Sequence, residues 1–322
     1  REKLAPSIAG SEIVFIEHGL DKDNIPVQMD FDVISIFVDS VIDAAVLEKM
    51  PNLKLIATRS TGFDHIDANI CKTRNIAIAS VPSYGENTVA EYAFGLILSL
   101  CRKIYEGYDR LKETGSFSFE GLQGFDLKGK TIGILGTGRI GRHVVQIAKG
   151  FDMKIVAYDP YPNTSFAEEA GLKYLSMDDV LKESDIVTIH VPYTTETHHL
   201  INERTLALMK KGAILINTSR GAVVDTEALV KALKNGPLGG VGLDVLEEEG
   251  VIKDEINFFV QGHIDEHNLK TVLANHVLID MPNVIITPHN AFNTVEALQR
   301  IHDTTVGNIT SFMRGEPTNL IK

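Results

Sequence analysis

The sequence predicts an α/β protein made of two doubly wound parallel-sheet domains, of the Rossmann or flavodoxin-like type, with a cleft between them. Three observations support this class. Short β-branched runs alternate with helical patterns, the alternation restarts after the glycine-rich stretch Gly115–Gly129, and 322 residues are too many for one ordinary core. No repeat of short period is present, so a solenoid is excluded.

The first series consists of short apolar runs and one long helix. Its predicted strands are Ile13–Ile16, Val33–Val38, Leu53–Thr58 and Ile76–Ala79. A helical pattern then runs from about Glu86 to Lys112, with one apolar face made of Ala90, Ala93, Phe94, Ile97 and Leu98. We interpret the following stretch, Gly115–Gly129, as a linker.

The second series has the same alternation. Its predicted strands are Thr131–Leu135, Lys154–Tyr158, Asp185–His190, Ala213–Asn217, Gly239–Leu243 and Val284–Thr287. A longer acidic insertion lies between the last two strands and contains a helical pattern near Asn268–Leu278. The chain closes with a helix from about Thr294 to Met313.

The composition excludes several classes of protein. Hydrophobic residues make up 44% and charged residues 23%, which is typical of a globular chain. The net charge of −12 disfavours binding to nucleic acid or to anionic membranes. No apolar stretch approaches the ~20 residues of a membrane helix, and Arg1–Gly10 has no apolar segment of a signal peptide. The two cysteines favour a reducing compartment, so we expect a cytoplasmic protein.

A dinucleotide motif opens the second series. The strand Thr131–Leu135 is followed at once by Gly136-Thr137-Gly138-Arg139-Ile140-Gly141, then by a helical pattern and a strand that ends at Asp159. Gly136 permits the tight turn, Gly138 lets backbone N–H groups approach a pyrophosphate, and Gly141 lets the helix pack closely. The Asp159 carboxylate would accept hydrogen bonds from ribose hydroxyls and repel a 2′-phosphate. We therefore predict NAD rather than NADP; a plain glycine turn beside a surface aspartate is the alternative.

Polar residues follow three late strands, where ligands of open α/β sheets collect. Arg220 follows Ala213–Asn217, the acidic run Asp244–Glu249 follows Gly239–Leu243, and His289 follows Val284–Thr287. An arginine can bind a carboxylate, a histidine can exchange a proton with a hydroxyl or carbonyl, and an acid can keep that histidine protonated. Taken singly, each is more often a surface or structural residue; together with the dinucleotide motif they predict an active site.

The same segments resemble the D-2-hydroxyacid dehydrogenase family over nearly the whole chain and in order. The resemblance is carried by Gly136–Gly141, His190-Val191-Pro192, Asn217–Gly221, Leu243–Glu249 and Thr287-Pro288-His289. Arg59–Asp64, Pro82-Ser83-Tyr84, the long segment after Glu249 and Pro288–Phe292 are similar to the D-lactate dehydrogenase branch.

The resemblance implies a role for each site residue. His289 is the acid–base group, Glu249 its partner, and Arg220 the anchor of the substrate carboxylate. The backbone amides of Thr61 and Gly62 complete the carboxylate site, and Tyr84 and Phe292 line the side-chain pocket. The family's cofactor positions fall on Arg139, Ile140, Asp159, Val191, Thr197, Thr218 and Asp244.

The resemblance also implies a discontinuous architecture and a homodimer. Residues 1–101 and 292–322 would form the substrate-binding domain, and residues 102–291 the NAD-binding Rossmann domain. The expected reaction is reduction of pyruvate by NADH to D-lactate. Because the chain begins at Arg1 without a methionine, we expect that its natural start lies upstream. We also expect Arg1–Ile8 to be a helix or its remnant, and the first sheet to lack one family strand.

Other functions stay open at this point. Ser60 stands where lactate enzymes often carry Asn, and Gly85-Glu86 replaces a more usual Ser-Pro. A bulkier 2-oxo acid such as 2-oxoisocaproate is therefore an alternative substrate, and so are glyoxylate, hydroxypyruvate and phosphite. A non-catalytic NAD-sensing regulator is an alternative of another class. No metal is expected: His198-His199 and the His263/His267 pair lack the glutamate of a zinc protease motif.

Overall fold

The structure is a computed structural model, and it describes residues 10–26, 30–249 and 269–321. The chain divides into two compact units, one formed by Arg1–Tyr84 with Asn293–Lys322 and the other by Gly85–Phe292. None of the helices in the described part of the chain is long and apolar enough to cross a membrane.

The first unit contains a parallel three-stranded sheet of order β1-β2-β3 among the described residues. Its elements are β1 (Val33–Ile36), α2 (Ala44–Glu48), β2 (Leu55–Thr58), α3 (Ala68–Thr73), β3 (Ala77–Ala79) and α14 (Val295–Met313). Ile309 of α14 packs on Leu55, Ala57 and Ala79, which explains why the end of the chain belongs to this unit. A bridge between Ala79 and Leu320 ties the final residues to β3.

Within its described residues, the second unit has a seven-stranded parallel sheet of order β10-β9-β8-β7-β4-β5-β6. Its strands are β4 (Thr131–Leu135), β5 (Lys154–Tyr158), β6 (Lys173–Tyr174), β7 (Ile186–Ile189), β8 (Ala213–Asn217), β9 (Leu238–Leu243) and β10 (Val284–Ile286). Its helices are α4 (Glu86–Cys101), α5 (Ile104–Thr114), α6 (Arg139–Gly150), α7 (Thr164–Ala170), α8 (Met177–Glu183), α9 (Glu203–Leu206), the 3-10 turn η1 (Gly221–Val223), α10 (Thr226–Asn235) and α13 (Leu269–Ile279).

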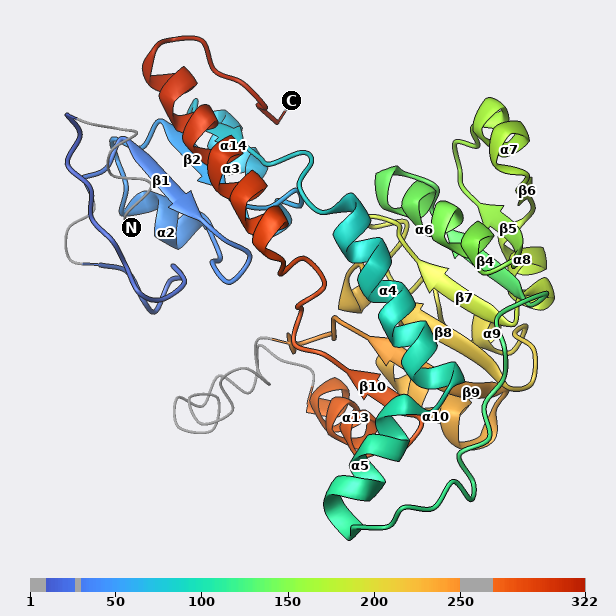
Figure 1. Cartoon of the computed structure of the whole chain (residues 1–322). Helices are drawn as coiled ribbons and strands as arrows, with labels where there is room; N and C mark the ends of the chain where they lie inside the picture. The colour runs from blue at the N-terminus through green and yellow to red at the C-terminus, as the bar shows by residue number, and fades with distance from the viewer. Residues whose placement is uncertain (1–9, 27–29, 250–268, 322) are drawn as a thin grey trace. The chain divides into compact units, whose positions relative to one another are not determined.

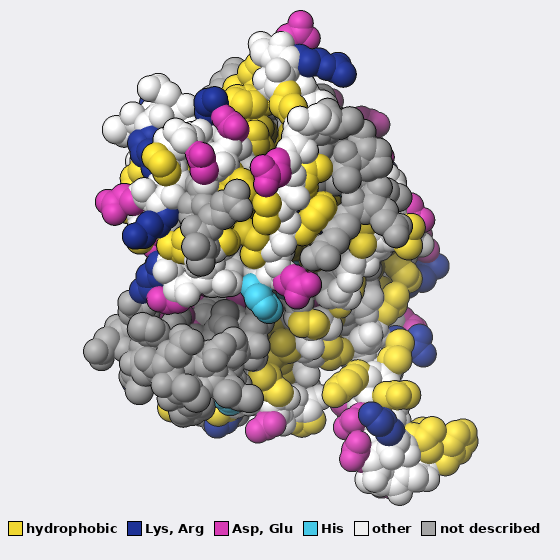
Figure 2. Space-filling model, turned by 90° about the vertical axis from the view of Figure 1, so that its left-hand side faces the viewer, with side chains coloured by type: hydrophobic (Ala, Val, Ile, Leu, Met, Phe, Trp, Pro, Cys, Tyr) yellow, Lys and Arg dark blue, Asp and Glu magenta, His cyan; other side chains and the backbone are white. Residues whose placement is uncertain are grey.

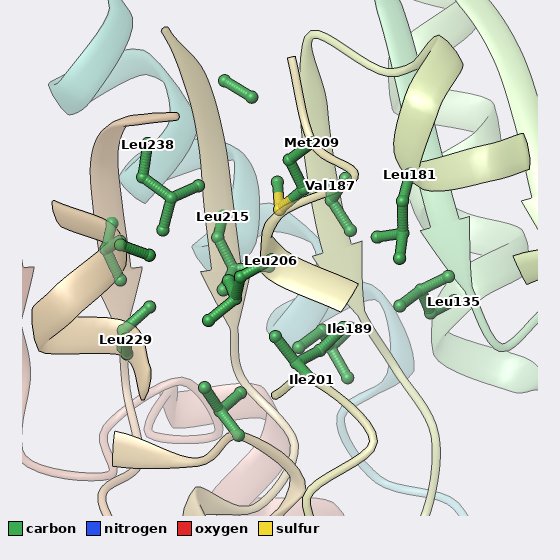
Figure 3. Close-up of a cluster of buried hydrophobic side chains, with 14 of the residues drawn as sticks. Leu135, Leu181, Val187, Ile189, Ile201, Leu206, Met209, Leu215, Leu229 and Leu238 are labelled. Atoms are coloured by element: carbon green, nitrogen blue, oxygen red, sulfur yellow. The ribbon is translucent and has the colours of Figure 1, made fainter. Parts of the chain in front are cut away.

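Successive strand residues face opposite cores, which makes this sheet doubly wound. Ile214 and Ile216 join the cluster under α4 and α6, whereas Leu215 joins the cluster under α8, α9, α10 and α13. Figure 1 shows α4 and α6 on the near face of the sheet. Figure 3 shows the second cluster, where strand residues such as Leu215 meet helix residues such as Leu206 and Leu229. Because both faces are covered, the strands are apolar throughout rather than alternating.

The predicted α/β class and parallel sheets are confirmed, but three details differ. Ile13–Ile16 is not a strand, and Val14, Phe15 and Ile16 are exposed by 39–45%. The predicted helix Glu86–Lys112 is two helices, because Lys103 is left-handed with φ 52° and the returning segment at Gly124 passes over the Cys101 carbonyl. Arg1–Ile8 lies outside the described residues.

The third difference is the boundary between the units, which falls between Tyr84 and Gly85 rather than after Cys101. Helix α4 packs its apolar face, including Ala93, Phe94 and Ile97, in the same core as α6 and β4. The helix therefore belongs with the seven-stranded sheet.

Candidate active site

The glycine motif forms the turn between β4 and α6 at the point where the strand order reverses. Gly136 has φ +93°, and a Cβ there would lie 2.8 Å from the His190 carbonyl oxygen at the end of β7. A Cβ on Gly141 would lie 2.1 Å from the Gly136 oxygen, so the first turn of α6 packs directly on the loop. A Cβ on Gly138 would meet no atom within 4 Å, which leaves open space beside the helix N-terminus. This is the crevice where open α/β sheets bind dinucleotides.

Asp159 organises this loop from the end of β5. One carboxylate oxygen accepts hydrogen bonds from the backbone N–H and the hydroxyl of Thr137, at 2.7 and 2.8 Å. The other accepts the Tyr161 N–H at 2.9 Å. The predicted ribose-binding acid therefore also holds the glycine turn in shape, a role that the motif alone did not indicate.

The other expected cofactor residues surround the same sheet edge. Arg139 and Ile140 open α6, Val191 and Thr197 follow β7, and Thr218 and Asp244 follow β8 and β9. The Thr218 hydroxyl is buried and has no hydrogen-bond partner among the described residues, so it is available to a ligand. In contrast, the Thr197 hydroxyl donates to the Pro192 carbonyl and accepts from the Thr194 N–H. The loop amides, the open space at Gly138 and the Thr218 hydroxyl together fit a dinucleotide.

His190 lies at the same edge of the sheet, directly after β7. Its Nε2 lies 2.8 Å from the hydroxyl of the buried Thr188. Burial lowers the pKa of the His190 imidazole to about 3, so the ring is neutral at physiological pH. His190 was predicted only as part of the family resemblance, because the local pattern of a strand end does not reveal the burial of its side chain.

The three proposed catalytic residues follow neighbouring strands, β8, β9 and β10. Glu249 and His289 are in direct contact, with 3.0 Å between the Glu249 Oε1 and the His289 Nδ1. Both side chains are partly exposed, 32% for Glu249 and 19% for His289, so the pair faces accessible space. This contact leaves Nε2 as the ring nitrogen that can reach a substrate.

Asp244 shapes the backbone that carries His289. Its carboxylate accepts hydrogen bonds from the Thr287 hydroxyl at 2.6 Å and from the N–H groups of Asn290 and Ala291 at 2.8 Å. Its carbonyl oxygen accepts the His289 N–H, and His289 has a left-handed backbone with φ 51°. Burial raises the pKa of the Asp244 carboxyl, against the opposing effect of these hydrogen bonds. Asp244 thus holds the turn that presents His289.

Arg220 lies directly after β8, at the start of η1. The side-chain amide of Asn217 donates to the Arg220 carbonyl. The Asn217 side-chain oxygen accepts from the backbone N–H and the hydroxyl of Ser219. The guanidinium donates to the Ser219 carbonyl at 2.9 Å. The backbone of Arg220 is therefore well defined at the sheet edge that also carries His289.

The remaining expected substrate residues are divided between the units. Thr61, Gly62 and Tyr84 belong to the first unit and Phe292 to the second. The Thr61 hydroxyl donates to the Val81 carbonyl, and the Ser60 hydroxyl donates to the Gly62 carbonyl. The Tyr84 carbonyl accepts from Arg300 of α14. These bonds stabilise the turn after β2, in which the Thr61 and Gly62 amides lie.

The histidine pairs do not form a metal site in the described residues. No group of three or more His, Cys, Asp or Glu side chains there could hold a metal ion. His198 and His199 stack with 3.9 Å between ring centroids, and His199 pairs with Glu247 at 2.7 Å. His263 and His267 lie outside the described residues.

Comparison with known proteins decides the family. Residues 94–291, more than half of the chain, match the model of the D-isomer specific 2-hydroxyacid dehydrogenase, NAD binding domain. The chain belongs to the D-isomer specific 2-hydroxyacid dehydrogenase family. It is therefore an NAD-dependent oxidoreductase, as the glycine loop and Asp159 predicted.

Relatives of this D-2-hydroxyacid dehydrogenase cover almost its whole length. A 2-hydroxyacid dehydrogenase homolog of Zymomonas mobilis is 41% identical over 95% of this chain and 91% of the relative. The D-lactate dehydrogenase of Escherichia coli is 36% identical over 97% of this chain and 93% of the relative. The solved D-lactate dehydrogenase of Aquifex aeolicus, in complex with NAD and lactic acid, has a TM-score of 0.82 at 39% identity, covering 92% of this chain and 86% of the other.

Proposed function

We propose that this chain is a D-lactate dehydrogenase that reduces pyruvate with NADH, using Arg220, Glu249 and His289. The observation that supports this most directly is the contact between the His289 Nδ1 and the Glu249 carboxylate, at 3.0 Å, in partly exposed positions at the edge of the cofactor sheet. A purely NAD-sensing protein has no need for a carboxylate-paired proton donor, whereas a carbonyl reductase does. The choice of pyruvate and D-lactate as substrate and product is supported by the D-lactate dehydrogenases among the relatives.

Each of the three residues has a separate role in the proposed reduction. Bound NADH supplies the hydride that reduces the carbonyl carbon. His289 transfers its Nε2 proton to the carbonyl oxygen, and the negative Glu249 stabilises the protonated ring before that transfer. Arg220 binds the substrate carboxylate with its planar guanidinium, which fixes the orientation of the carbonyl. Hydride and proton together convert the 2-oxo acid to the 2-hydroxy acid.

Substrate recognition extends to residues of both units in this proposal. The backbone amides of Thr61 and Gly62 donate to the same carboxylate as Arg220, and neither amide donates to another residue in the described ranges. Tyr84 and Phe292 limit the space for the substrate side chain. Because two aromatic rings leave space for a methyl group and little more, we expect pyruvate to be preferred to branched 2-oxo acids.

The test is a panel of 2-oxo acids ranked by kcat/KM with NADH. Pyruvate should exceed 2-oxoisocaproate by roughly 10–200-fold, the range that a misfit hydrocarbon group usually produces. His289→Ala, which removes the proton donor, is the control and should lose at least ~10²-fold of pyruvate reduction with little change in NADH binding. D- and L-lactate are then offered separately with NAD. Preference for another acid would overturn lactate, and comparable rates on both lactates would overturn the fixed orientation.

We also propose that the enzyme is a cytoplasmic homodimer. Both cysteines are free and buried, which suits a reducing compartment. Helix α5 buries none of its side chains, and the exposed fractions of Tyr108, Phe117 and Phe119 are 63%, 94% and 91%. α5 is the lowest element in Figure 1, and the lowest projection in Figure 2 carries hydrophobic side chains. Such a surface is typical of a protein interface.

Sedimentation of the purified protein tests the dimer. We expect a dimer that dissociates when Tyr108 and Phe119 are both replaced by Glu, since a buried charge without a partner opposes association. A monomeric parent protein would contradict this assignment without bearing on the chemistry of His289.

A further inference from the structure

Glu247 is an extensively hydrogen-bonded carboxylate near the catalytic pair, although it belongs to neither the cofactor nor the substrate residues. One oxygen lies 2.7 Å from the His199 Nε2. The other accepts from the Thr226 N–H at 3.0 Å and from the Thr226 hydroxyl at 2.6 Å. The side chain is only 13% exposed. The Glu247 carboxylate is nearly buried, and each of its oxygens is hydrogen-bonded. It therefore resists displacement, because a shift would leave a desolvated carboxylate without partners.

The backbone of Glu247 is held as firmly as its side chain. Its carbonyl oxygen accepts the side-chain amide of Asn275, at 2.7 Å, and Asn275 is fully buried in α13. Thr226 is the first residue of α10, whose N-terminal dipole favours a carboxylate. Glu247 is thus tied to two helices that pack on the sheet.

Glu247 begins the turn that ends at Glu249. Glu248 has a left-handed backbone with φ 54°, which reverses the chain between the two glutamates. As a result the Glu247 carboxylate points to His199 and Thr226, while the Glu249 carboxylate lies against His289. With Glu247 fixed, the short turn leaves little freedom for the position of Glu249.

The segment that carries Arg220 rests on the same turn. A Cβ on Gly221 would lie 2.0 Å from the Leu246 carbonyl carbon and 2.3 Å from the Glu247 nitrogen. The two backbones therefore touch directly, and any shift of Glu247 moves the residue next to Arg220.

His199 completes the anchor from a third segment. It has φ 48°, its N–H donates to the Ala222 carbonyl, and its carbonyl accepts the Asn202 side chain. Its ring stacks on His198. These bonds fix the imidazole that faces Glu247.

We propose that Glu247, held by His199 and Thr226, is a positioning residue that aligns Glu249 with His289 and seats the Arg220 segment. This inference rests on the proposed function, because it takes the roles of Glu249 and His289 from there. Glu247 does not touch the substrate; it acts through the turn.

The test compares Glu247→Gln with Glu227→Gln as a matched control. Glu227 lies in the first turn of α10, next to Thr226, and contacts α13 through Lys270 at 3.3 Å, but it is not part of the Glu249 turn. We expect Glu247→Gln to lower kcat for pyruvate reduction by about 10–100-fold, as small misplacements of catalytic groups do, with little change in KM for NADH. Glu227→Gln should match the parent in both.

A second pair of variants keeps the test decisive if Glu247→Gln does not fold. His199→Ala should show the same loss of kcat with KM for NADH little changed, and His199→Gln, which restores an N–H donor, should recover much of the lost kcat. If His289→Ala and Glu249→Gln are inactive while the Glu247 and His199 variants behave as Glu227→Gln, the positioning role is wrong and the proposed function stands. A loss of kcat in His199→Ala that His199→Gln does not restore would also overturn it. If His289→Ala retains full activity, the proposed function itself fails.

Discussion

A few carboxyl groups determine the geometry around the proposed proton donor. Asp244 holds the backbone of residues 287–291, Glu249 contacts the His289 ring, and Glu247 anchors the turn that bears Glu249. The strand ends predicted that His289 and an acidic residue would meet at one edge of a parallel sheet. The choice of Glu249 among three successive glutamates was implied only by the family resemblance. Motif spacing could not predict Glu247 as an anchor, because its partners His199, Thr226 and Asn275 come from three distant segments.

The charge of Glu249 can be tested separately from its hydrogen bond. Glu249→Gln keeps a polar group 3.0 Å from the His289 Nδ1 but removes the negative charge. Because the proton donor then lacks its anionic partner, we expect kcat/KM for pyruvate to fall by at least ~10-fold while NADH binding changes little. A kcat/KM equal to that of the parent would contradict the role of Glu249.

His190 predicts a specific dependence of stability on pH. Its pKa is about 3 in the folded protein and near 6.5 when exposed, so the unfolded chain binds more protons between these values. Its contribution to stability is therefore complete above about pH 6.5 and is lost as the pH falls towards about 3. The free energy of unfolding of His190→Gln, measured by urea titration, should decline less steeply than that of the parent across this interval. Equal slopes would show that the ring is not desolvated.

At the scale of elements, local patterns predicted most strands of the second unit because those strands are apolar on both faces. The secondary structure predicted for two segments was wrong. The predicted helix Glu86–Lys112 breaks at Lys103 because Gly124 returns over Cys101. Ile13–Ile16 has a strand-like sequence but is not a strand of the sheet that the described residues form.

The segments after β8 and β9 touch at Gly221, so the addition of one methyl group there should strongly affect stability and kcat. Gly221→Ala would place a Cβ 2.0 Å from the Leu246 carbonyl carbon, so the two segments must separate. We expect a loss of stability of about 1–3 kcal/mol, typical of overpacking, together with a large loss of kcat. Gly150→Ala is the matched control, because a Cβ there meets no atom within 4 Å. If both variants have the melting temperature and kcat of the parent, the contact is unimportant.

At the scale of the whole molecule, the two α/β series correspond to two compact units. The return of the chain's end to the first unit was implied by the resemblance, since no local pattern shows which sheet a final helix will cover. In the structure, buried Asn308 of α14 provides this connection. Its side-chain amide donates to the Ser80 carbonyl at 2.8 Å, and its oxygen accepts from Asn319 at 2.8 Å.

Replacing Asn308 should therefore destabilise one unit and leave the other intact. Asn308→Ala leaves buried partners without hydrogen bonds, which costs about 1–3 kcal/mol. We expect earlier unfolding of the first unit, followed by hydrogen exchange in β1–β3, and an unchanged affinity for NADH. A weaker affinity for NADH would mean that the units do not behave independently.

The break at Lys103 also has a consequence for how this fold can diversify. The Phe125 N–H donates to the Cys101 carbonyl at 2.9 Å, so the excursion from residue 102 to residue 124 leaves and rejoins the molecule at nearly one point. Insertions and deletions in such a closed excursion cost little chain entropy and do not disturb the strands on either side. Evolution or an engineer can therefore exchange this excursion for another segment, while the strands and loops that carry the NAD site are inherited unaltered.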